Sequence, residues 1–328
     1  MSIKRGFFLG KFMPPHQGHM LICRTALALV DELTVMLCSL PGDPIPGDLR
    51  LRWLRELLPQ ARVVHHNQPI PQEPAEHPQF WDIWRRAIQA VHPEPIDEVY
   101  GSDQYIHQLA ETLGAEAVLI DPNREAVPTS ASAIRAHPSS QWRYIPGVVR
   151  PHFVKRVCLF GPESTGKTTL ARMLAAHYGA TFMPEYGRIF DEQYQPEQWC
   201  PEHLVRIAKR HEAIRTALLH SARPLVFEDT DALLTIIWSR ALVGEVDPWF
   251  EREFALADLY LLTDVDVPWV QDEQGSRQFG SDDMRRQFFR ECKEVLDSRG
   301  ANYQLLHGDW ASREQTALAA VDHLLGQL

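Results

Sequence analysis

Short apolar segments alternate with segments of helical periodicity along nearly the whole chain, and this alternation limits the fold more than any other feature. In the first half the predicted strands are 6–10, 33–39, 62–66, 97–101 and 116–121, and the predicted helices are 16–30, 49–58, 79–91 and 103–113. Short apolar runs between helices are typical of a parallel sheet covered on both faces. The first half is therefore predicted to be a doubly wound, Rossmann-like α/β domain.

Two proline-rich segments interrupt the alternation. Residues 67–78 are predicted to form a loop, because proline disfavours helix interiors and central strands. Residues 137–155 indicate a domain boundary near residue 150. Beyond it we expect strands 156–160, 224–229, 258–263 and 302–306, and helices from 167, at 201–221, 231–243, 282–298 and 312–326. Because domains typically hold about 100 to 200 residues, the 328 residues indicate two tandem α/β domains, 1–150 and 151–328.

The composition is that of an ordinary globular protein, with 45% apolar and 23% charged residues. The net charge is −10 and neither half has a basic excess, so we expect small phosphorylated ligands and no nucleic acid. The five scattered cysteines lack a C-x-x-C pair and indicate reduced, buried thiols. Charged residues break the most apolar stretch, 21–40, so we expect no membrane span and a cytoplasmic protein. Whether the chain forms a homo-oligomer is left open.

Residues 161–168 read GPESTGKT, a complete G-x-x-x-x-G-K-[ST] motif between a predicted strand and a predicted helix. Gly161 and Gly166 permit a tight turn that directs backbone N–H groups at phosphates, and the helix N-terminus adds partial positive charge. Lys167 is expected to reach the β- and γ-phosphates, and Thr168 to bind Mg²⁺. The predicted ATP-binding residues are Gly161, Pro162, Glu163, Ser164, Thr165, Gly166, Thr168 and Thr169.

Acidic residues lie at the C-terminal end of the predicted strand 224–229, in the sequence LVFEDTD, residues 225–231. Asp229 is the preferred Mg²⁺ residue, directly or through water, with Glu228 and Asp231 as alternatives. The sequence PEYGR, residues 184–188, offers Glu185 as a carboxylate beside a substrate hydroxyl and Arg188 as a phosphate or substrate contact; an ordinary loop ion pair would look the same. The kinase general base is left open among Glu185, Asp229 and Asp231.

Residues 269–286 carry Arg277, Arg285 and Arg286 around Gly275 and Gly280. Arginines that close over ATP stabilise charge on the transferring phosphoryl group, so this segment is predicted to be a lid, with Arg277 preferred as the catalytic arginine. An exposed, charged helix start is the alternative.

The first predicted strand runs into GKFMPPHQGH, residues 10–19. His16 and His19 could bind a metal, but no carboxylate or cysteine at helpful spacing completes such a site. The segment resembles the nucleotidyltransferase superfamily, whose H-x-G-H histidines bind the triphosphate and stabilise attack at the α-phosphorus. TSASAIR, residues 129–135, matches the usual partner motif of that superfamily. The resemblance implies a nucleotide site that includes Gly10, Lys11, Phe12, His16, Gly18, His19, Ser130, Ser132 and Arg135. Ser130 and Ser132 are expected to cap a helix.

The order of these motifs resembles the NadR family of bifunctional nicotinamide-mononucleotide (NMN) adenylyltransferases and ribosylnicotinamide kinases. Further matching stretches are IPGDLRLRWL (45–54), FWDIW (80–84), YGSDQY (100–105), EDTDALLT (228–235) and PWVQDEQGSR (268–277). The resemblance implies phosphorylation of nicotinamide riboside to NMN with ATP and Mg²⁺, followed by adenylylation of NMN with a second ATP to give NAD and pyrophosphate. Some members carry an N-terminal helix-turn-helix domain; here the first strand starts within ten residues of Met1, so we expect no DNA binding.

Two other functions remain open at this point. Coenzyme A biosynthesis also joins an H-x-G-H adenylyltransferase to a P-loop kinase. A sensor that binds ATP and NAD without turnover would carry the same motifs. The preference between nicotinamide and nicotinic acid substrates is not set by the residues.

Overall fold

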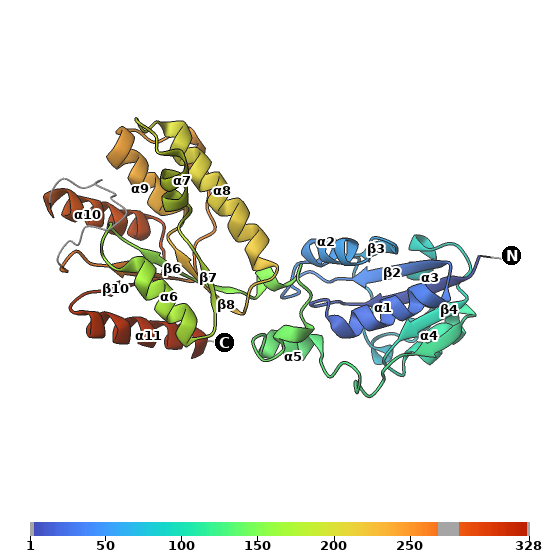
Figure 1. Cartoon of the computed structure of the whole chain (residues 1–328). Helices are drawn as coiled ribbons and strands as arrows, with labels where there is room; N and C mark the ends of the chain where they lie inside the picture. The colour runs from blue at the N-terminus through green and yellow to red at the C-terminus, as the bar shows by residue number, and fades with distance from the viewer. Residues whose placement is uncertain (1–2, 268–281, 327–328) are drawn as a thin grey trace. The chain divides into compact units, whose positions relative to one another are not determined.

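The structure, a computed structural model, describes residues 3–267 and 282–326. It divides into two compact units, Met1–Arg150 and Pro151–Leu328. Each unit is built on one five-stranded parallel sheet with helices on both faces (Figure 1). The predicted α/β class, with two tandem units of which the first is doubly wound, is confirmed.

The first unit has the strand order β3-β2-β1-β4-β5. Its strands are β1 Arg5–Gly10, β2 Glu32–Cys38, β3 Arg62–His66, β4 Glu98–Gly101 and β5 Glu116–Leu119. Its helices are α1 Gln17–Leu29, α2 Gly47–Leu57, α3 Phe80–Val91, α4 Ile106–Leu113 and α5 Ala131–Ala136, with short 3₁₀ turns at Pro74–Glu76, Trp142–Tyr144 and Arg150–His152. The predicted loop at 67–78 therefore contains one 3₁₀ turn.

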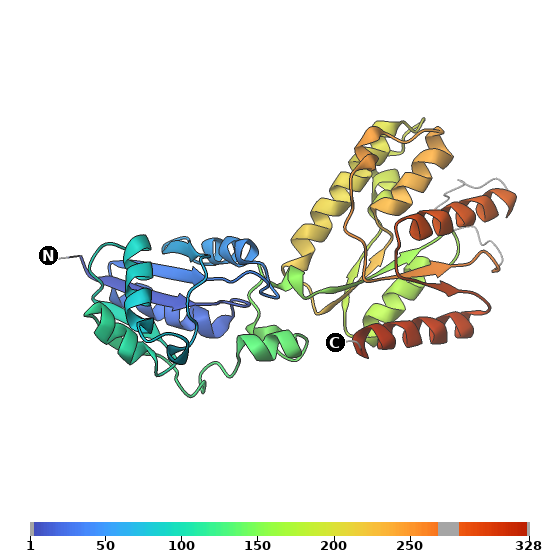
Figure 2. The same ribbon diagram turned by 180° about the vertical axis from the view of Figure 1, so that it is seen from behind.

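Side chains alternate across the first sheet, as the period of two along a strand requires. Phe8, Val35 and Leu37 pack against α1 and α2, whereas Phe7, Met36 and Val99 pack against α3 and α4. Figure 2 shows the face that carries α3 in front of the strands. Because both faces are buried, the strands are apolar almost throughout, which is why the sequence predicts them well.

The second unit has the strand order β10-β9-β6-β8-β7. Its strands are β6 Lys155–Phe160, β7 Thr181–Met183, β8 Leu225–Asp229, β9 Leu259–Thr263 and β10 Tyr303–Leu306. Its helices are α6 Lys167–His177, α7 Tyr186–Tyr194, α8 Pro201–Leu219, α9 Ala232–Val243, α10 Asp282–Ser298 and α11 Trp310–Gly326, with a 3₁₀ turn at Pro248–Glu251. The segment around PEYGR thus enters a helix, which the sequence analysis did not predict.

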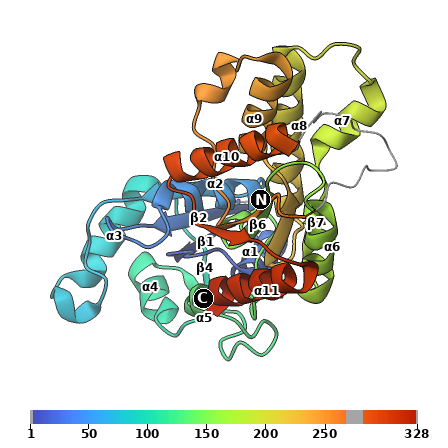
Figure 3. The same cartoon turned by 90° about the vertical axis from the view of Figure 1, so that its left-hand side faces the viewer.

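The helices of the second unit form two layers. Leu159, Phe227 and Leu261 face α6 and α11, whereas Cys158, Phe160 and Tyr260 face α8, α9 and α10. Figure 3 shows α10 and α11 on opposite sides of the sheet. Among the described residues, none of the helices is long and apolar enough to span a membrane.

Candidate functional site

The phosphate loop leaves β6 through backbone that only glycine adopts easily. Gly161 has a φ of 137° and Gly166 a φ of 86°. A Cβ atom on Gly161 would lie 2.5 Å from the Thr263 Oγ1 at the end of the neighbouring strand β9. The loop is therefore pressed against the carboxyl edge of the sheet, and both glycines are structural requirements of this path.

Lys167 begins α6 and is buried, with its Nζ donating to the Pro162 carbonyl at 2.7 Å. Thr165 Oγ1 donates to the same carbonyl at 2.8 Å and lies 2.6 Å from Thr263 Oγ1. Thr168 and Thr169 follow in the first turn of α6, with Thr168 half-buried and Thr169 exposed. The ammonium group is thus held over the loop whose N–H groups would bind phosphate.

Two carboxylates from other elements lie near this lysine. Asp229 ends β8, and its Oδ1 is buried with no hydrogen-bond partner within the described residues. Glu185 precedes α7, and burial together with the negative charge of Asp229 raises its pKa to about 7, against the opposing charges of Lys167 and Arg188. Arg188 Nε lies 4.0 Å from Glu185 Oε2, so the PEYGR segment does contain an ion pair.

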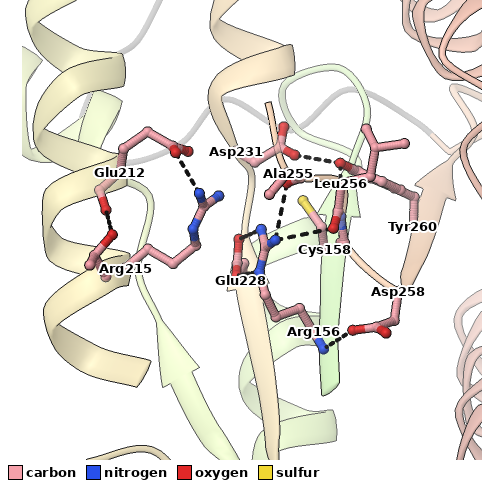
Figure 4. Close-up of polar contacts among 12 residues, drawn as sticks. Arg156, Cys158, Glu212, Arg215, Glu228, Asp231, Ala255, Leu256, Asp258 and Tyr260 are labelled. Carbon is pink, nitrogen blue, oxygen red and sulfur yellow. Dashed lines mark hydrogen bonds and ion pairs between the residues drawn. The ribbon is translucent and has the colours of Figure 1, made fainter. Parts of the chain in front are cut away.

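The two alternatives to Asp229 have other partners (Figure 4). Glu228 is fully buried and forms a two-point ion pair with Arg156, at 2.5 Å to Nε and 2.9 Å to Nη2. Asp231 caps α9 by accepting from the N–H groups of Leu233 and Leu234, and it also accepts from the Tyr260 hydroxyl at 2.7 Å. Asp229 is therefore the residue of the three whose carboxylate is left for a ligand.

The sequence analysis did not identify Arg156 as a partner of Glu228. A signal was present, because each residue is a charge next to the apolar part of a strand, and buried charges require partners. The guanidinium also donates to the carbonyls of Ala255 and Leu256, at 3.1 and 3.2 Å. The pair joins β6, β8 and the segment before β9, and so holds the strand end that carries Asp229.

The predicted lid arginines differ in placement. Arg277, with Gly275 and Gly280, lies outside the described residues. Arg285, in the first two turns of α10, is buried; among the described residues its Nε and Nη2 have no hydrogen-bond partner, while Nη1 lies 3.6 Å from Asp282. Arg286 is exposed. Of the two described arginines, Arg285 is the one with unused donors in a buried place.

The histidines of the first unit lie at the start of α1, directly after the loop that leaves β1. Their rings stack with centroids 3.7 Å apart. His16 Nδ1 accepts from the Gly18 N–H at 3.2 Å, and His19 Nδ1 accepts from the His16 N–H at 3.3 Å. An imidazole whose Nδ1 accepts carries its proton on Nε2. Both rings therefore present an Nε2–H donor.

Burial keeps both imidazoles neutral. It lowers the pKa of His16 to about 4, with help from the charge of Arg124, and it lowers the pKa of His19 well below its ordinary value, with help from His16 and Arg124. The sequence analysis did not identify Arg124 as a site residue. Its distinguishing local feature is a positive backbone φ of 54°. The adjacent Asp121 carboxylate accepts from the N–H groups of Glu125, Ala126 and Val127, at 2.8 to 3.0 Å, and so shapes this loop.

The TSASAIR motif of the first unit contacts the GKFMPPHQGH motif. Ser130 caps α5 by accepting from the Ala133 N–H at 3.1 Å, and its hydroxyl lies 2.9 Å from that of Ser132. Ser130 is thus the capping residue, whereas Ser132 contacts it. The Arg135 guanidinium donates to the Met13 carbonyl, in the loop between β1 and α1. The TSASAIR and GKFMPPHQGH segments therefore lie side by side, as their resemblance implies.

Lys11 is exposed at the end of β1, and a buried arginine fixes its backbone. Arg50 of α2 donates to the Lys11 carbonyl at 2.6 Å and pairs with Asp43 at 2.5 Å. Phe12 is buried at a φ of 46°, against Gly10 and His19. Beside Lys11 lies a small cavity of about 10 Å³, whose lining includes Lys11, Ser39, His66 and Trp84. Within the described residues, no cluster of three or more His, Cys, Asp or Glu side chains could hold a metal.

Comparison with known proteins adds to this geometry. Residues 156–313 match the AAA domain family. The trifunctional NAD biosynthesis/regulator protein NadR of Escherichia coli (strain K12) is 29% identical over 353 residues, which cover 98% of this chain and 83% of the relative. The nicotinamide-nucleotide adenylyltransferase of Pyrobaculum neutrophilum is 33% identical over 120 residues, 35% of this chain and 65% of that protein.

A crystal structure of a NadR protein in complex with NAD and AMP-PNP covers 99% of this chain and 97% of its own, with a TM-score of 0.76 and 22% identity. A second one, in complex with NR, has the same TM-score at 24% identity. The fold is thus a nucleotidyltransferase unit followed by a P-loop kinase unit. The chain is similar to NadR proteins over nearly its whole length.

Proposed function

We propose that this chain makes NAD in two ATP-dependent steps. The second unit phosphorylates the 5′-hydroxyl of nicotinamide riboside, and the first unit transfers AMP from a second ATP to the resulting mononucleotide, releasing pyrophosphate. One observation carries the proposal: each unit places its own set of phosphate-binding groups at the carboxyl ends of its parallel strands. Ligands of open α/β sheets bind at that edge. The NAD-related names of the relatives support the choice of substrates.

In the kinase step, the phosphate loop and Lys167 hold the triphosphate. Glu185 accepts the proton of the riboside hydroxyl as its oxygen attacks the γ-phosphorus, and ADP leaves. A carboxylate whose pKa is raised to about 7 suits this role, because a general base acts best when its pKa lies near the working pH. The buried, unpartnered donors of Arg285 are placed to stabilise charge on the transferring group.

Magnesium fits the same site. The buried Oδ1 of Asp229 lacks a partner within the part of the chain that the structure describes, and the Thr168 hydroxyl lies in the first turn of the helix that follows the phosphate loop. Mg²⁺ is usually held by one or two protein oxygens plus phosphates and water, so a larger acidic cluster is not required. When bound, the ion neutralises phosphate charge. Asp229 and Thr168 would hold it.

In the adenylyl step, a phosphate oxygen of NMN attacks the α-phosphorus and pyrophosphate leaves. His16 and His19 are neutral, so they donate hydrogen bonds through Nε2–H while Lys11, Arg124 and Arg135 supply positive charge. Preorganised donors at developing charge are a large source of rate enhancement. The step needs no covalent intermediate, because positioning of the two phosphates and electrostatics are sufficient.

The residues around the small cavity beside Lys11 are proposed to contact the mononucleotide. Trp84 in the cavity wall is held by a hydrogen bond from Nε1 to the Pro71 carbonyl, at 2.9 Å, within the proline-rich segment. His66 and Ser39 add polar groups at the ends of β3 and β2. A wall that combines an aromatic ring with a lysine suits a nucleotide with an aromatic base and a phosphate.

Mass spectrometry of the products tests the proposal. Incubation with ATP, Mg²⁺ and nicotinamide riboside should give NMN, ADP, NAD and pyrophosphate. Phosphopantetheine in place of the riboside tests the coenzyme A alternative. Absence of both NMN and NAD with active, folded protein would contradict the proposal and favour a sensor.

A further inference from the structure

A large aromatic side chain stands in the open beside the phosphate loop. Trp310, the first residue of α11, is 42% exposed. A Cβ atom on Gly166 would lie 2.9 Å from its ring carbon Cζ3, so the indole ring lies directly against the loop, next to Lys167. Neither the motifs nor the steps above use this residue. Single exposed apolar side chains are common on protein surfaces, so it is the place of this indole beside the phosphate loop that suggests a role.

The backbone that carries Trp310 is firmly held by Arg313, one turn further along α11. The Arg313 guanidinium is almost fully buried and donates to the carbonyls of Thr165 and Gly308, both at 3.0 Å, and of Asp264 at 3.1 Å. It also pairs with the Asp266 carboxylate. One side chain thus joins the phosphate loop, the end of β9 and the turn before α11.

The same turn has two further ties. The Gly308 N–H donates to Asp266 Oδ2 at 2.5 Å, and Asp309 Oδ1 accepts from the Ser312 N–H at 2.9 Å. The indole is therefore exposed on a fixed backbone, in a constant position relative to the phosphate loop. A fixed aromatic surface binds with a smaller loss of conformational entropy than a mobile one does.

We propose that Trp310 is the surface on which the purine base of ATP stacks in the second unit, with Arg313 as the residue that positions it. The inference rests on the proposed function only in taking the phosphate loop as an ATP site. With the phosphates on the loop, the base must lie beside it, and a flat indole ring at that place offers the stacking that nucleic-acid bases favour. Stacking on an aromatic side chain changes affinity by about 5- to 100-fold.

The test compares Trp310→Ala, Trp310→Phe and Ile214→Ala. Ile214 is a matched control, because it is also 42% exposed but lies on α8. Calorimetry with AMP-PNP and with inorganic tripolyphosphate separates base binding from phosphate binding. Lys167→Ala identifies which of the two AMP-PNP sites belongs to the second unit. A tryptophan fluorescence change on AMP-PNP binding that Trp310→Ala abolishes is a second readout.

We expect Trp310→Ala to weaken AMP-PNP binding about 5- to 100-fold and to leave tripolyphosphate binding unchanged. Trp310→Phe should retain most of the affinity, and Ile214→Ala all of it. Unchanged AMP-PNP affinity in Trp310→Ala, or equal weakening of both ligands, would overturn the inference. Because these experiments measure binding, their result does not depend on whether nicotinamide riboside is the phosphate acceptor. If Trp310 proves not to bind the base, the proposed kinase activity is unaffected.

Discussion

Glu228 and Asp229 are consecutive residues of β8 whose carboxylates lie on opposite faces of the second sheet. Glu228 is in register with Cys158, on the face of α8 and α9, and Asp229 is in register with Leu159, on the face of the phosphate-loop helix α6. The alternation of side chains along a strand thus assigns the two acids different tasks. Glu228 binds Arg156 within the fold, while Asp229 is left for a ligand.

The buried pair between Glu228 and Arg156 should dominate the stability of the second unit. Glu228→Gln leaves the guanidinium without its charge partner, and breaking a buried pair costs about 3–5 kcal/mol of unfolding free energy. Urea unfolding followed by circular dichroism measures the loss. Lys155→Gln is the control, since its ion pair with Asp258 is partly exposed and should contribute about 0–1 kcal/mol. Equal effects of the two substitutions would contradict the expectation.

Lys167→Ala should abolish phosphorylation of nicotinamide riboside and leave adenylylation of supplied NMN nearly unchanged. The reason is that Lys167 belongs to the second unit, whereas the histidine pair belongs to the first. Separate assays for ADP and for pyrophosphate measure the two steps. Loss of both activities in a folded variant would count against independent sites.

His19→Ala should lower adenylylation about 10²- to 10³-fold, because it removes one preorganised donor, and His16→Ala should do the same. Kinase activity should persist in both variants. Initial rates of pyrophosphate release at saturating NMN and ATP give the comparison. A stoichiometric zinc requirement at these histidines would instead indicate a metal site.

Glu185→Gln should lower kinase turnover and remove a pH dependence. The pKa of Glu185 is raised to about 7, so the carboxylate form needed as base is lost as the pH falls below that value. In the unsubstituted protein, kcat/KM for nicotinamide riboside should therefore rise with pH through about 7 and then level off. If kcat/KM of Glu185→Gln still rises with pH through about 7, the general base is another residue, such as Asp229.

Arg285→Ala should reduce kinase turnover more than it reduces ATP affinity. A buried guanidinium with unused donors contributes to charge that develops in the transition state, whereas Lys167 and the loop hold the nucleotide. Single-turnover phosphorylation and AMP-PNP calorimetry separate the two effects. Arg286→Ala is the matched control on the exposed side of α10. A normal single-turnover rate in Arg285→Ala would make Arg285 a structural residue only.

The sequence predicted well what is local. The strands, helices and phosphate loop were predicted from the spacing of apolar residues and from the positions of glycine and proline. Most predicted bounds lie within three residues of those observed. It did not reveal the arginines that join distant segments. Arg313 binds the Thr165 carbonyl 148 residues away, and Arg50 binds the Lys11 carbonyl 39 residues away. Each sits in an amphipathic helix, where an arginine has the same appearance as a surface charge, so only the tertiary contact identifies its task.

The neutral histidines and the titrating Glu185 give the two proposed steps different responses to acid. Between pH 7 and pH 5, Glu185 becomes protonated while His16 keeps its neutral form. Acidification should therefore slow phosphorylation of the riboside and leave adenylylation of NMN that is already present unchanged. In the proposed two-step sequence, a falling pH would therefore limit the supply of NMN before it limits the conversion of NMN to NAD.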